Sequence, residues 1–421
     1  MRPAQQKDVF DTMKSSTTFH PRLAEHWIHQ CQSQHKQCQV RLDSPGFRPT
    51  RIIEVGKEFP PRPRLCLSKD LGHRKIQYLT LSHCWGTRPL LRLLHSNLSS
   101  MLDSIPYDDL PKTFREAVQI TQQLGYRYLW IDSLCIIQDD SQDWVKESAL
   151  MRAVYSNGLC NLSAAGATDS SKGLFFDRDP RTVQPVKMQM DRQPAWGSSM
   201  EVAFRDMRMW EKNIADAPLN GRAWVVQERL LSRANLLFGA KQLFWECRKH
   251  RACEMFPEYS SDFNSSFGAK NVKGNFQAKR TLNYKFNDLD MVIEQWASVV
   301  HVYSKGALTC KTDKLVALAG LASHMHRDIE VQYVAGLWDR MSFAWQLMWH
   351  ATGPDSLPPE QYIAPSWSWA SISRQVAFES GNSFSPLVEV LDVKVETLGE
   401  FVLLQCGSLI VVLNSSCESK V

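Results

Sequence analysis

Side chains able to take part in catalysis follow two apolar, strand-like runs of the sequence. His83 and Trp85 come just after the run QYLTLS, and Asp132 and Cys135 come at and just after the end of YLWI. A histidine can act as a general base, a cysteine as a nucleophile, and a carboxylate can position or activate a ligand. We therefore treat His83, Asp132 and Cys135 as candidate catalytic residues. Trp85 and the nearby Gln138 are candidate ligand-binding residues.

Each of these side chains also has a purely structural interpretation. His83 can be a packed histidine at a strand end, and Asp132 can cap the turn that follows it. Cys135 stands beside two isoleucines, a setting typical of an inert buried thiol.

A further carboxylate lies on a helix predicted in the segment GRAWVVQERLL. Glu228 stands on this helix, with Trp224 one turn before it and Gln227 directly before it. If the helix folds over the strand ends, the Glu228 carboxylate could stabilise or attack an oxocarbenium-like ribose centre, as glycosidase carboxylates do. Glu228 is thus a candidate catalytic residue, and Trp224 and Gln227 are candidate ligand-binding residues. The alternative for Glu228 is a structural salt bridge to Arg222 or Arg229.

Metal-binding residue types gather near the N-terminus, at His26, His29, Cys31, His35 and Cys38. The spacing Cys-x3-His-x2-Cys offers three ligands for zinc, and the fourth would have to be His26 or Cys66. Short zinc modules pair their ligands in two groups, and the second group is missing here. Cys31 is also needed on the apolar face of a predicted helix. We therefore predict no metal site.

An alternation of strands and helices must position the catalytic candidates. Strands are predicted at 76–82, 128–132 and 159–165, and helices at 113–124 and 141–155. The first helix begins with a Thr-x-x-Glu capping box. This βαβαβ pattern requires a parallel sheet with crossover helices. Ligands bind outside the carboxyl ends of such strands, where the candidate residues stand.

The rest of the chain divides by composition and periodicity. Four parts are predicted: a helical and extended arm at 1–70, an α/β domain at 71–250, a loop or linker at 251–280, and an α+β C-terminal segment at 281–421. In the arm, the run from Leu23 to Cys31 has helical spacing, and residues 45–63 are expected to run extended over the surface. Further helices are predicted at 222–231, 289–303 and 313–324, and further strands at 236–238, 243–247, 331–335, 367–372, 388–395 and 400–413.

Composition excludes several classes of protein. The 49 Lys+Arg and 44 Asp+Glu leave a net charge of +5 over 421 residues, without a long basic run, so no nucleic-acid partner is expected. The opening residues lack a secretory signal, and Phe401–Leu413 is too short and interrupted to span a membrane. The 11 cysteines are read as reduced thiols, so we predict a cytoplasmic location. Phosphate-binding, dinucleotide-binding, hydrolase-elbow and zinc-protease motifs do not occur.

Several blocks of the chain, in order, resemble the fungal heterokaryon incompatibility (HET) domain. These blocks are LSHCWG at 81–86, LPKTFREA at 110–117, YLWIDSLCIIQDD at 128–140, GLF at 173–175 and GRAWVVQERLLS at 221–232. Later segments, such as TDKLVALAGLA and APSWSWAS, are similar to sequence that follows this domain in many fungal proteins. The resemblance covers most of the chain.

The resemblance implies a part in vegetative incompatibility, in which fusion of unlike fungal cells leads to growth arrest or regulated death. It implies a fold similar to Toll/interleukin-1 receptor (TIR) domains, which are flavodoxin-like parallel sheets, and a protein partner or a homo-oligomer. Some TIR domains cleave NAD, so an NAD glycohydrolase is one alternative, with NAD as substrate and no certain cofactor. A HET fold recruited to secondary-metabolite biosynthesis and a non-catalytic, self-associating scaffold are the others.

Overall fold

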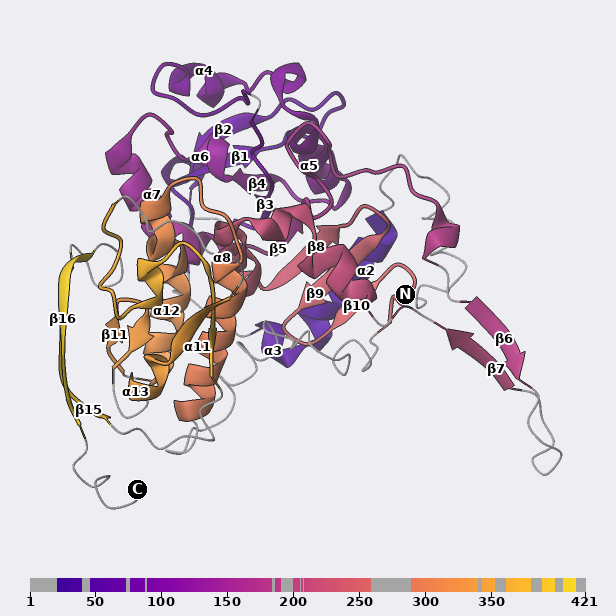
Figure 1. The fold of residues 1–421 in the computed structure, drawn as a ribbon. Coiled ribbons are helices and arrows are strands. Elements are labelled where there is room, and N and C mark those ends of the chain that lie inside the picture. The colour runs from indigo at the N-terminus through magenta and orange to yellow at the C-terminus, as the bar shows by residue number, and fades with distance from the viewer. Residues whose placement is uncertain are drawn as a thin grey trace.

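A mixed eight-stranded sheet forms the centre of the structure, a computed structural model (Figure 1). Its strands lie in the order β10 (Arg251–Cys253), β9 (Leu243–Cys247), β8 (Ala234–Phe238), β5 (Cys160–Ser163), β3 (Tyr78–Ser82), β4 (Tyr128–Ile131), β1 (Arg51–Glu54) and β2 (Arg64–Leu67). The structure describes residues 21–39, 46–72, 76–87, 89–183, 186–190, 200–204, 206, 208–258, 289–329, 331–339, 343–352, 361–379, 388–397 and 404–413.

Four neighbouring strands in the middle of this sheet are parallel. β3 pairs with β4 on one side and with β5 on the other, and β5 pairs with β8. β1 and β9 extend the sheet antiparallel at its two sides, and each carries a further antiparallel strand, β2 or β10. The predicted α/β class with a parallel core is thereby confirmed.

Helices cover both faces of the sheet (Figure 1). Because β4 and β5 flank β3 on opposite sides, right-handed crossovers place their helices on opposite faces. One face carries α5 (Lys112–Gln123) and α2 (Pro21–Gln34), and the other carries α7 (Ser141–Asn157) and α8 (Ala223–Leu231). The shorter helices are α3 (Lys36–Gln39), α4 (Leu98–Asp103) and α6 (Asp132–Cys135).

The two faces of the sheet differ in polarity. On the α7 side, Tyr78 donates a hydrogen bond to the backbone of α7, and the alternate positions Thr80 and Ser82 share this face. On the other side, Leu79 and Leu81 continue an apolar surface that reaches the buried tryptophans of α2 and β9. Half of the sheet centre is therefore an ordinary apolar core, while the other half buries hydroxyl and amide groups.

The C-terminal segment packs on α8. Helices α11 (Leu289–Ser304) and α12 (Val316–Ile329) lie against it, and the backbone of Gly306 approaches Ala223 so closely that a Cβ there would lie 2.7 Å from it. The remaining elements are α13 (Phe343–Gln346) and the two-stranded pairs β6 (Val186–Met190) with β7 (Met200–Phe204), β11 (Tyr333–Val334) with β12 (Leu337–Trp338), β13 (Trp349–Thr352) with β14 (Gln375–Phe378), and β15 (Val388–Thr397) with β16 (Leu404–Leu413).

Most predicted elements are confirmed, and three predictions are wrong. Within 45–63, Arg51–Glu54 is not a surface segment but the buried strand β1, hydrogen-bonded to β4. Within 367–372, Trp369–Ser371 is a short 3-10 helix, because the Ser368 hydroxyl accepts a hydrogen bond from Ala370 and turns the chain. Glu116 does not cap α5. Instead, its carboxylate accepts hydrogen bonds from the 174–175 backbone.

Two further predictions concern the C-terminal strands and the linker before the C-terminal segment. The strands predicted at 388–395 and 400–413 are confirmed as β15 and β16, which pair antiparallel. Of the loop or linker predicted at 251–280, residues 251–258 are described, and Arg251–Cys253 form the sheet strand β10, while residues 259–280 lie outside the described residues. Among the helices that the structure describes, none combines the length and the apolar character needed to cross a membrane.

Candidate functional site

The carboxyl ends of β3 and β4 bring three of the candidate side chains together. The indole Nε1 of Trp85 donates a 3.1 Å hydrogen bond to Oδ2 of Asp132, and Asp132 Oδ1 accepts from the backbone of Ser133 at 2.7 Å. His83 Nδ1 lies 3.8 Å from Asp132 Oδ1, and the His83 ring stacks parallel to Trp85 at 6.4 Å. Of His83, Asp132 and Cys135, which were predicted to converge, His83 and Asp132 lie together at this end of the sheet, and Trp85 joins them.

His83 is the buried member of this group. Its side chain is 1% exposed, and Phe114 of α5 packs edge-on against the imidazole at 4.8 Å. Burial lowers the pKa of His83 to about 4, against the opposing effect of Asp132. The ring is thus neutral near pH 7, and neither of its nitrogens has a hydrogen-bond partner among the described residues. A neutral imidazole in this position can accept or relay a proton but adds no positive charge.

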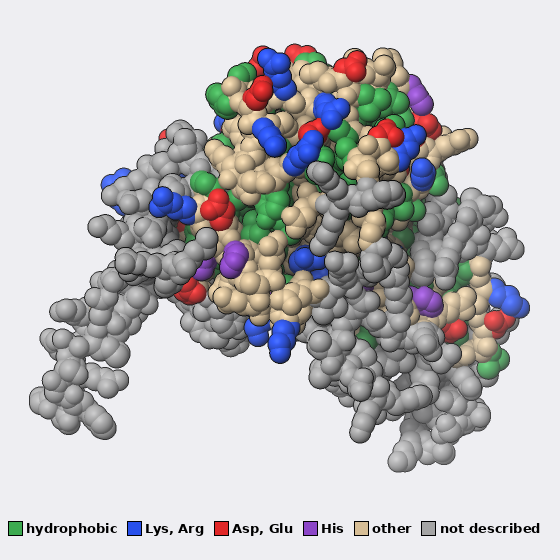
Figure 2. Space-filling view, turned by 180° about the vertical axis from the view of Figure 1, so that it is seen from behind, with side chains coloured by type: hydrophobic (Ala, Val, Ile, Leu, Met, Phe, Trp, Pro, Cys, Tyr) green, Lys and Arg blue, Asp and Glu red, His purple; other side chains and the backbone are tan. Residues whose placement is uncertain are grey.

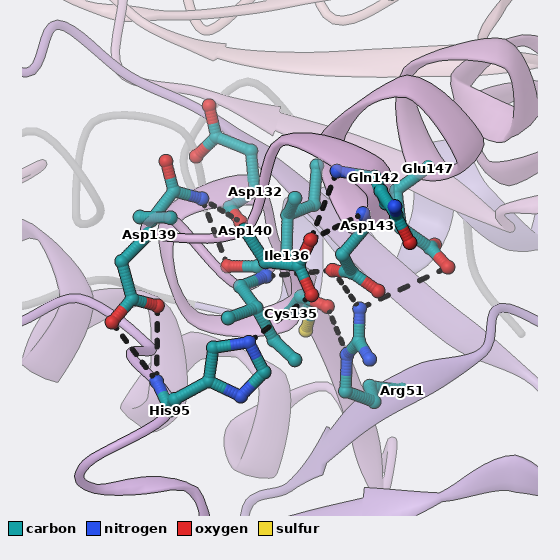
Figure 3. A network of polar contacts seen from close by, with 12 residues as sticks. Arg51, His95, Asp132, Cys135, Ile136, Asp139, Asp140, Gln142, Asp143 and Glu147 are labelled. Carbon is teal, nitrogen blue, oxygen red and sulfur yellow. Dashed lines mark hydrogen bonds and ion pairs between the residues drawn. The ribbon is translucent and has the colours of Figure 1, made fainter.

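Asp132 is the more accessible member. Its side chain is 16% exposed, and it opens the short helix α6 at the point where β4 ends. Figure 3 shows the Asp132 carboxylate turned away from the polar network formed by the residues that follow it. A carboxyl group held by one indole and one backbone N–H has oxygen lone pairs left to accept a further donor from a ligand.

The loop after Asp132 is fixed by internal hydrogen bonds. These contacts give Cys135 and Gln138 structural roles in the loop. The Gln138 amide donates to the carbonyls of Asp132 and Ile136 at 3.3 and 2.9 Å, so it braces the loop. The carbonyl of Cys135 accepts from Arg51 Nε at 2.6 Å, and burial raises the pKa of the Cys135 thiol to about 12. These surroundings are those of a packed core cysteine and do not favour a thiolate nucleophile.

The start of α7 completes the support of this loop (Figure 3). The Asp140 carboxylate caps the helix by accepting from the backbone of Gln142 and Asp143. Asp143 pairs with Arg51, which reaches across from β1, and accepts at 2.8 Å from the backbone of Ile137. The carboxylates at this helix start therefore act in capping and ion pairing, which is the structural role that helix N-termini favour.

Glu228 lies on the opposite face of the sheet from His83. Its carboxylate accepts a hydrogen bond from the Ser82 hydroxyl and is 2% exposed. Burial raises the pKa of Glu228 to about 7, although Arg222 and the hydrogen bond from Ser82 oppose this. The predicted alternative of a salt bridge to Arg229 is wrong, because Arg229 pairs with the buried Glu246.

A buried amide network surrounds the contact between Ser82 and Glu228. Nδ2 of Asn161 on β5 lies 3.0 Å from the hydroxyl of Ser82, 3.0 Å from that of Ser163 and 3.1 Å from the side-chain oxygen of Asn235 on β8, so its two N–H groups are shared among three acceptors. The hydroxyl of Thr80 donates back to Asn161 at 3.0 Å. Such networks stabilise a fold only when their members are all satisfied, so this one fixes the relative positions of three parallel strands.

Two further candidates, Trp224 and Gln227, contact the C-terminal segment. The Gln227 side-chain oxygen accepts a 2.9 Å hydrogen bond from the backbone of Gly320 on α12. The side chain of Trp224 hydrogen-bonds to Asp313, just before α12. Both side chains therefore hold α8 against the C-terminal segment, and these contacts account for their positions without a ligand.

A cleft of about 390 Å3 opens beside Trp85, a size suited to a small ligand. Apolar residues from the loop after β3 line one side, and the N-terminal turn of α5 lines another with Lys112 and Arg115. Asp109 and Asp169 add acidic groups. Figure 2 shows basic and acidic side chains interspersed over the end of the molecule that carries α4 and α5. The cleft thus offers an aromatic edge and charges of both signs.

Two glycines set the shape of this cleft. Gly86 has a φ of +75°, and a Cβ on it would lie 2.5 Å from Cβ of Asp169. Gly173 has a φ of +83°, and a Cβ there would lie 2.5 Å from the Glu116 carboxylate. The loop after β3 can approach Asp169, and the 169–175 loop can approach α5, only because these two positions lack a side chain.

The comparison with known proteins bears on the same part of the chain. Residues 78–228 match the family model described as heterokaryon incompatibility protein (HET). The chain contains a HET domain. No curated protein and no solved structure matches it. The HET match begins at the first residue of β3 and ends at Glu228, so it includes Trp85, Asp132, Ser82 and Glu228, while Asn235 of β8 lies beyond it.

Sequence reasoning missed several residues of the HET domain site. The polar network was not predicted, because the strands at 76–82 and 159–165 were identified without assigning partners to their polar side chains. The alternation of Thr80 and Ser82 with two leucines was the available signal for a polar face. Lys112 and Arg115 were missed because nothing in the local sequence shows that the start of α5 borders a cleft.

Proposed function

We propose that the chain acts in vegetative incompatibility, as a cytoplasmic effector or regulator of the response to nonself fusion that ends in growth arrest or regulated cell death. The HET domain supports this class of function. Nine cysteines in the described part of the chain form no disulfide, which suits a reducing compartment.

The observation that carries this proposal is the pairing of Trp85 with Asp132 beside the cleft. In open α/β sheets ligands bind outside the carboxyl ends of strands, where the strand order reverses. The reversal here lies between β3 and β5, and the loop after β3 supplies Trp85. We take this pair and the cleft as the place where the HET domain meets the molecule on which it acts.

Induced expression of the whole chain in a filamentous fungus tests the proposal. Hyphal extension and uptake of a vital dye are followed beside cells that carry the empty vector. We expect arrested extension and dye uptake only in cells that make the protein. Normal growth of cells whose immunoblot shows the full-length chain would count against an effector role.

We propose NAD cleavage as a second candidate function. The parallel strands follow the flavodoxin-like order, second, first, third and fourth along the chain, which favours a TIR-like fold. In this reaction water hydrolyses the bond between ribose C1′ and nicotinamide. The water oxygen bonds to C1′, nicotinamide leaves with the bonding pair, and the water gives up a proton. A carboxylate stabilises the developing positive charge on the ribose, or attacks it first.

Asp132 is better placed for that role than Glu228. Its side chain is 16% exposed and hydrogen-bonded to an indole at the cleft, while Glu228 is 2% exposed behind the sheet. Release of nicotinamide from NAD by the purified chain, followed by chromatography, is the test. We expect release by the wild type and none by Asp132→Asn. An inert wild type at high protein concentration would exclude NAD cleavage and leave the incompatibility proposal standing.

Self-association and protein partners form a separate part of the proposal. We propose that the chain signals through another protein, with a homo-oligomer as the scaffold alternative. A scaffold predicts that the apparent mass in size-exclusion chromatography rises with protein concentration, whereas a constant monomer mass argues against it. The hypothesis of a role in secondary-metabolite biosynthesis predicts normal growth in the expression test.

A further inference from the structure

Four metal-ligating side chains meet at one buried point between the N-terminal helices and the sheet. They are Cys31, His35, Cys38 and Cys247, and one ligand atom from each lies within 4.8 Å of all the others. All four residues are buried. The first three come from α2, the junction after it and α3, and the fourth is the last residue of β9.

The spacing of the ligand atoms fits a single tetrahedral ion. Cys247 Sγ lies 3.5 Å and Cys38 Sγ lies 3.9 Å from Nδ1 of His35. With zinc–sulfur and zinc–nitrogen bonds of about 2.3 and 2.1 Å, tetrahedral geometry separates sulfur from nitrogen by about 3.6 Å. Nδ1 of His35 therefore stands at the distances that a shared zinc ion would require.

The surroundings also suit thiolate ligands. The backbone N–H of His250 donates to Cys247 Sγ at 3.4 Å, and the backbone of Lys249 hydrogen-bonds to Cys38. The ring of His250 packs edge-on against His35 at 4.7 Å, which fixes the orientation of that imidazole. Backbone donors to sulfur and a fixed imidazole are the outer contacts that hold the ligands of a metal site.

We propose that Cys31, His35, Cys38 and Cys247 bind one zinc ion. The site has four protein ligands and is buried, which is the arrangement of a structural zinc site and leaves no open position for catalysis. The fourth ligand is neither His26 nor Cys66, the two that the sequence suggested. It lies 212 residues beyond His35 in the chain, so spacing alone could not reveal it.

Such an ion would link the N-terminal helices α2 and α3 to β9 of the sheet. Trp27 of α2 already stacks on Trp245 of β9 at 6.0 Å, and its indole donates to the carbonyl of Pro257 at 2.8 Å. A link between α3 and β9 closes a very long loop, which is where a cross-link restricts the unfolded chain most. All four ligands lie outside residues 78–228, so the site adds its own constraint to the HET domain.

The test uses the full chain, purified in the absence of chelators. We expect elemental analysis to find about one zinc per chain. Cobalt(II) exchanged into the protein should give the visible absorption of a tetrahedral ion, with a sulfur-to-cobalt charge-transfer band. Folded protein that contains no zinc and does not take up cobalt would overturn the proposal, as would a disulfide between two of these cysteines in freshly purified protein.

Matched variants separate metal loss from misfolding. Cys247→Ser should lose the zinc, while Cys66→Ser, which changes another buried cysteine, should retain it. His35→Cys supplies a fourth thiolate, so it should still bind zinc and give a stronger charge-transfer band with cobalt. Full zinc content in Cys247→Ser, or a cobalt spectrum of His35→Cys that is identical to that of the wild type, would contradict the assignment of these ligands.

Discussion

The hydroxyl of Ser82 donates a hydrogen bond to the carboxylate of Glu228, 146 residues later in the chain. This contact joins the first parallel strand to α8, close to the two ends of the matched HET segment. Glu228 therefore joins the two ends of the matched HET segment in the protein interior, whereas Trp85 and Asp132 lie at its more accessible edge.

Glu228→Gln is expected to change how stability depends on pH. Burial raises the pKa of Glu228 from 4.5 to about 7, so between these values the folded chain holds a proton that the unfolded chain has released. The stability that this group contributes is complete below pH 4.5 and is lost as the pH rises through 7, by about 3 kcal/mol. Glutamine does not titrate and can still accept the hydrogen bond from Ser82.

Urea unfolding of the wild type and Glu228→Gln at pH about 5 and about 8 measures this effect. The free energy of unfolding of the variant, relative to the wild type, should increase by about 3 kcal/mol at the higher pH. A difference between the two proteins that stays constant with pH would show that Glu228 ionises normally.

His83→Phe is expected to change the dependence of stability on pH in the opposite direction. Burial lowers the pKa of His83 from 6.5 to about 4, so in this window the unfolded chain holds the additional proton. The contribution of His83 to stability is complete above pH 6.5 and is lost as the pH falls through 4, again by about 3 kcal/mol. Phenylalanine keeps an aromatic ring between Trp85 and Phe114, so acidification should destabilise the variant less than the wild type in urea titrations.

The local sequence was sufficient to predict the parallel core. Strands and helices from Tyr78 to Ser163 follow from apolar periodicity and from helix-ending signals, and their order requires parallel pairing. The strand Arg51–Glu54, which lies between β4 and β2, was not predictable in the same way. It contains two charged residues, and its burial depends on partners such as Asp143 that lie far along the chain.

The candidate site was predictable only in part, for a similar reason. His83, Trp85 and Asp132 meet because carboxyl ends of neighbouring parallel strands share an edge, which is a property of the topology. Whether a helical residue such as Glu228 or Gln227 points at the sheet or at another helix depends on tertiary packing. The sequence near these residues contains no signal for that choice.

Gly86→Ala is expected to destabilise the chain more than Gly125→Ala does. Both glycines have positive φ, +75° and +76°, so alanine is strained at either position by about 1 kcal/mol. At Gly86 the new Cβ also lies 2.5 Å from Cβ of Asp169, while at Gly125 nothing lies within 4 Å. The overlap should add about 1–3 kcal/mol in denaturant titrations. Equal losses would mean that the two loops do not meet at Gly86.

Gln227→Ala is expected to loosen the packing of α8 against the C-terminal segment. The substitution removes the hydrogen bond that Gln227 accepts from the backbone of Gly320, at a cost of about 0.5–1.5 kcal/mol. Gln142→Ala, on an exposed turn of α7, is the control and should change stability by less than about 0.5 kcal/mol. A loss in Gln227→Ala no larger than that in the control would remove Gln227 from this interface and return it to the ligand-binding candidates.

The central claim, that the HET domain acts through Asp132 beside the cleft, is tested most directly by a matched pair of aspartate variants. Asp139 lies in the same loop, where its carboxylate accepts from the backbone of His95 at 3.0 Å. Hyphal growth is measured after induced expression of the wild type, Asp132→Asn and Asp139→Asn at equal protein levels. We predict that the wild type and Asp139→Asn arrest growth and that Asp132→Asn does not. Arrest by Asp132→Asn as strong as that by the wild type would contradict the claim.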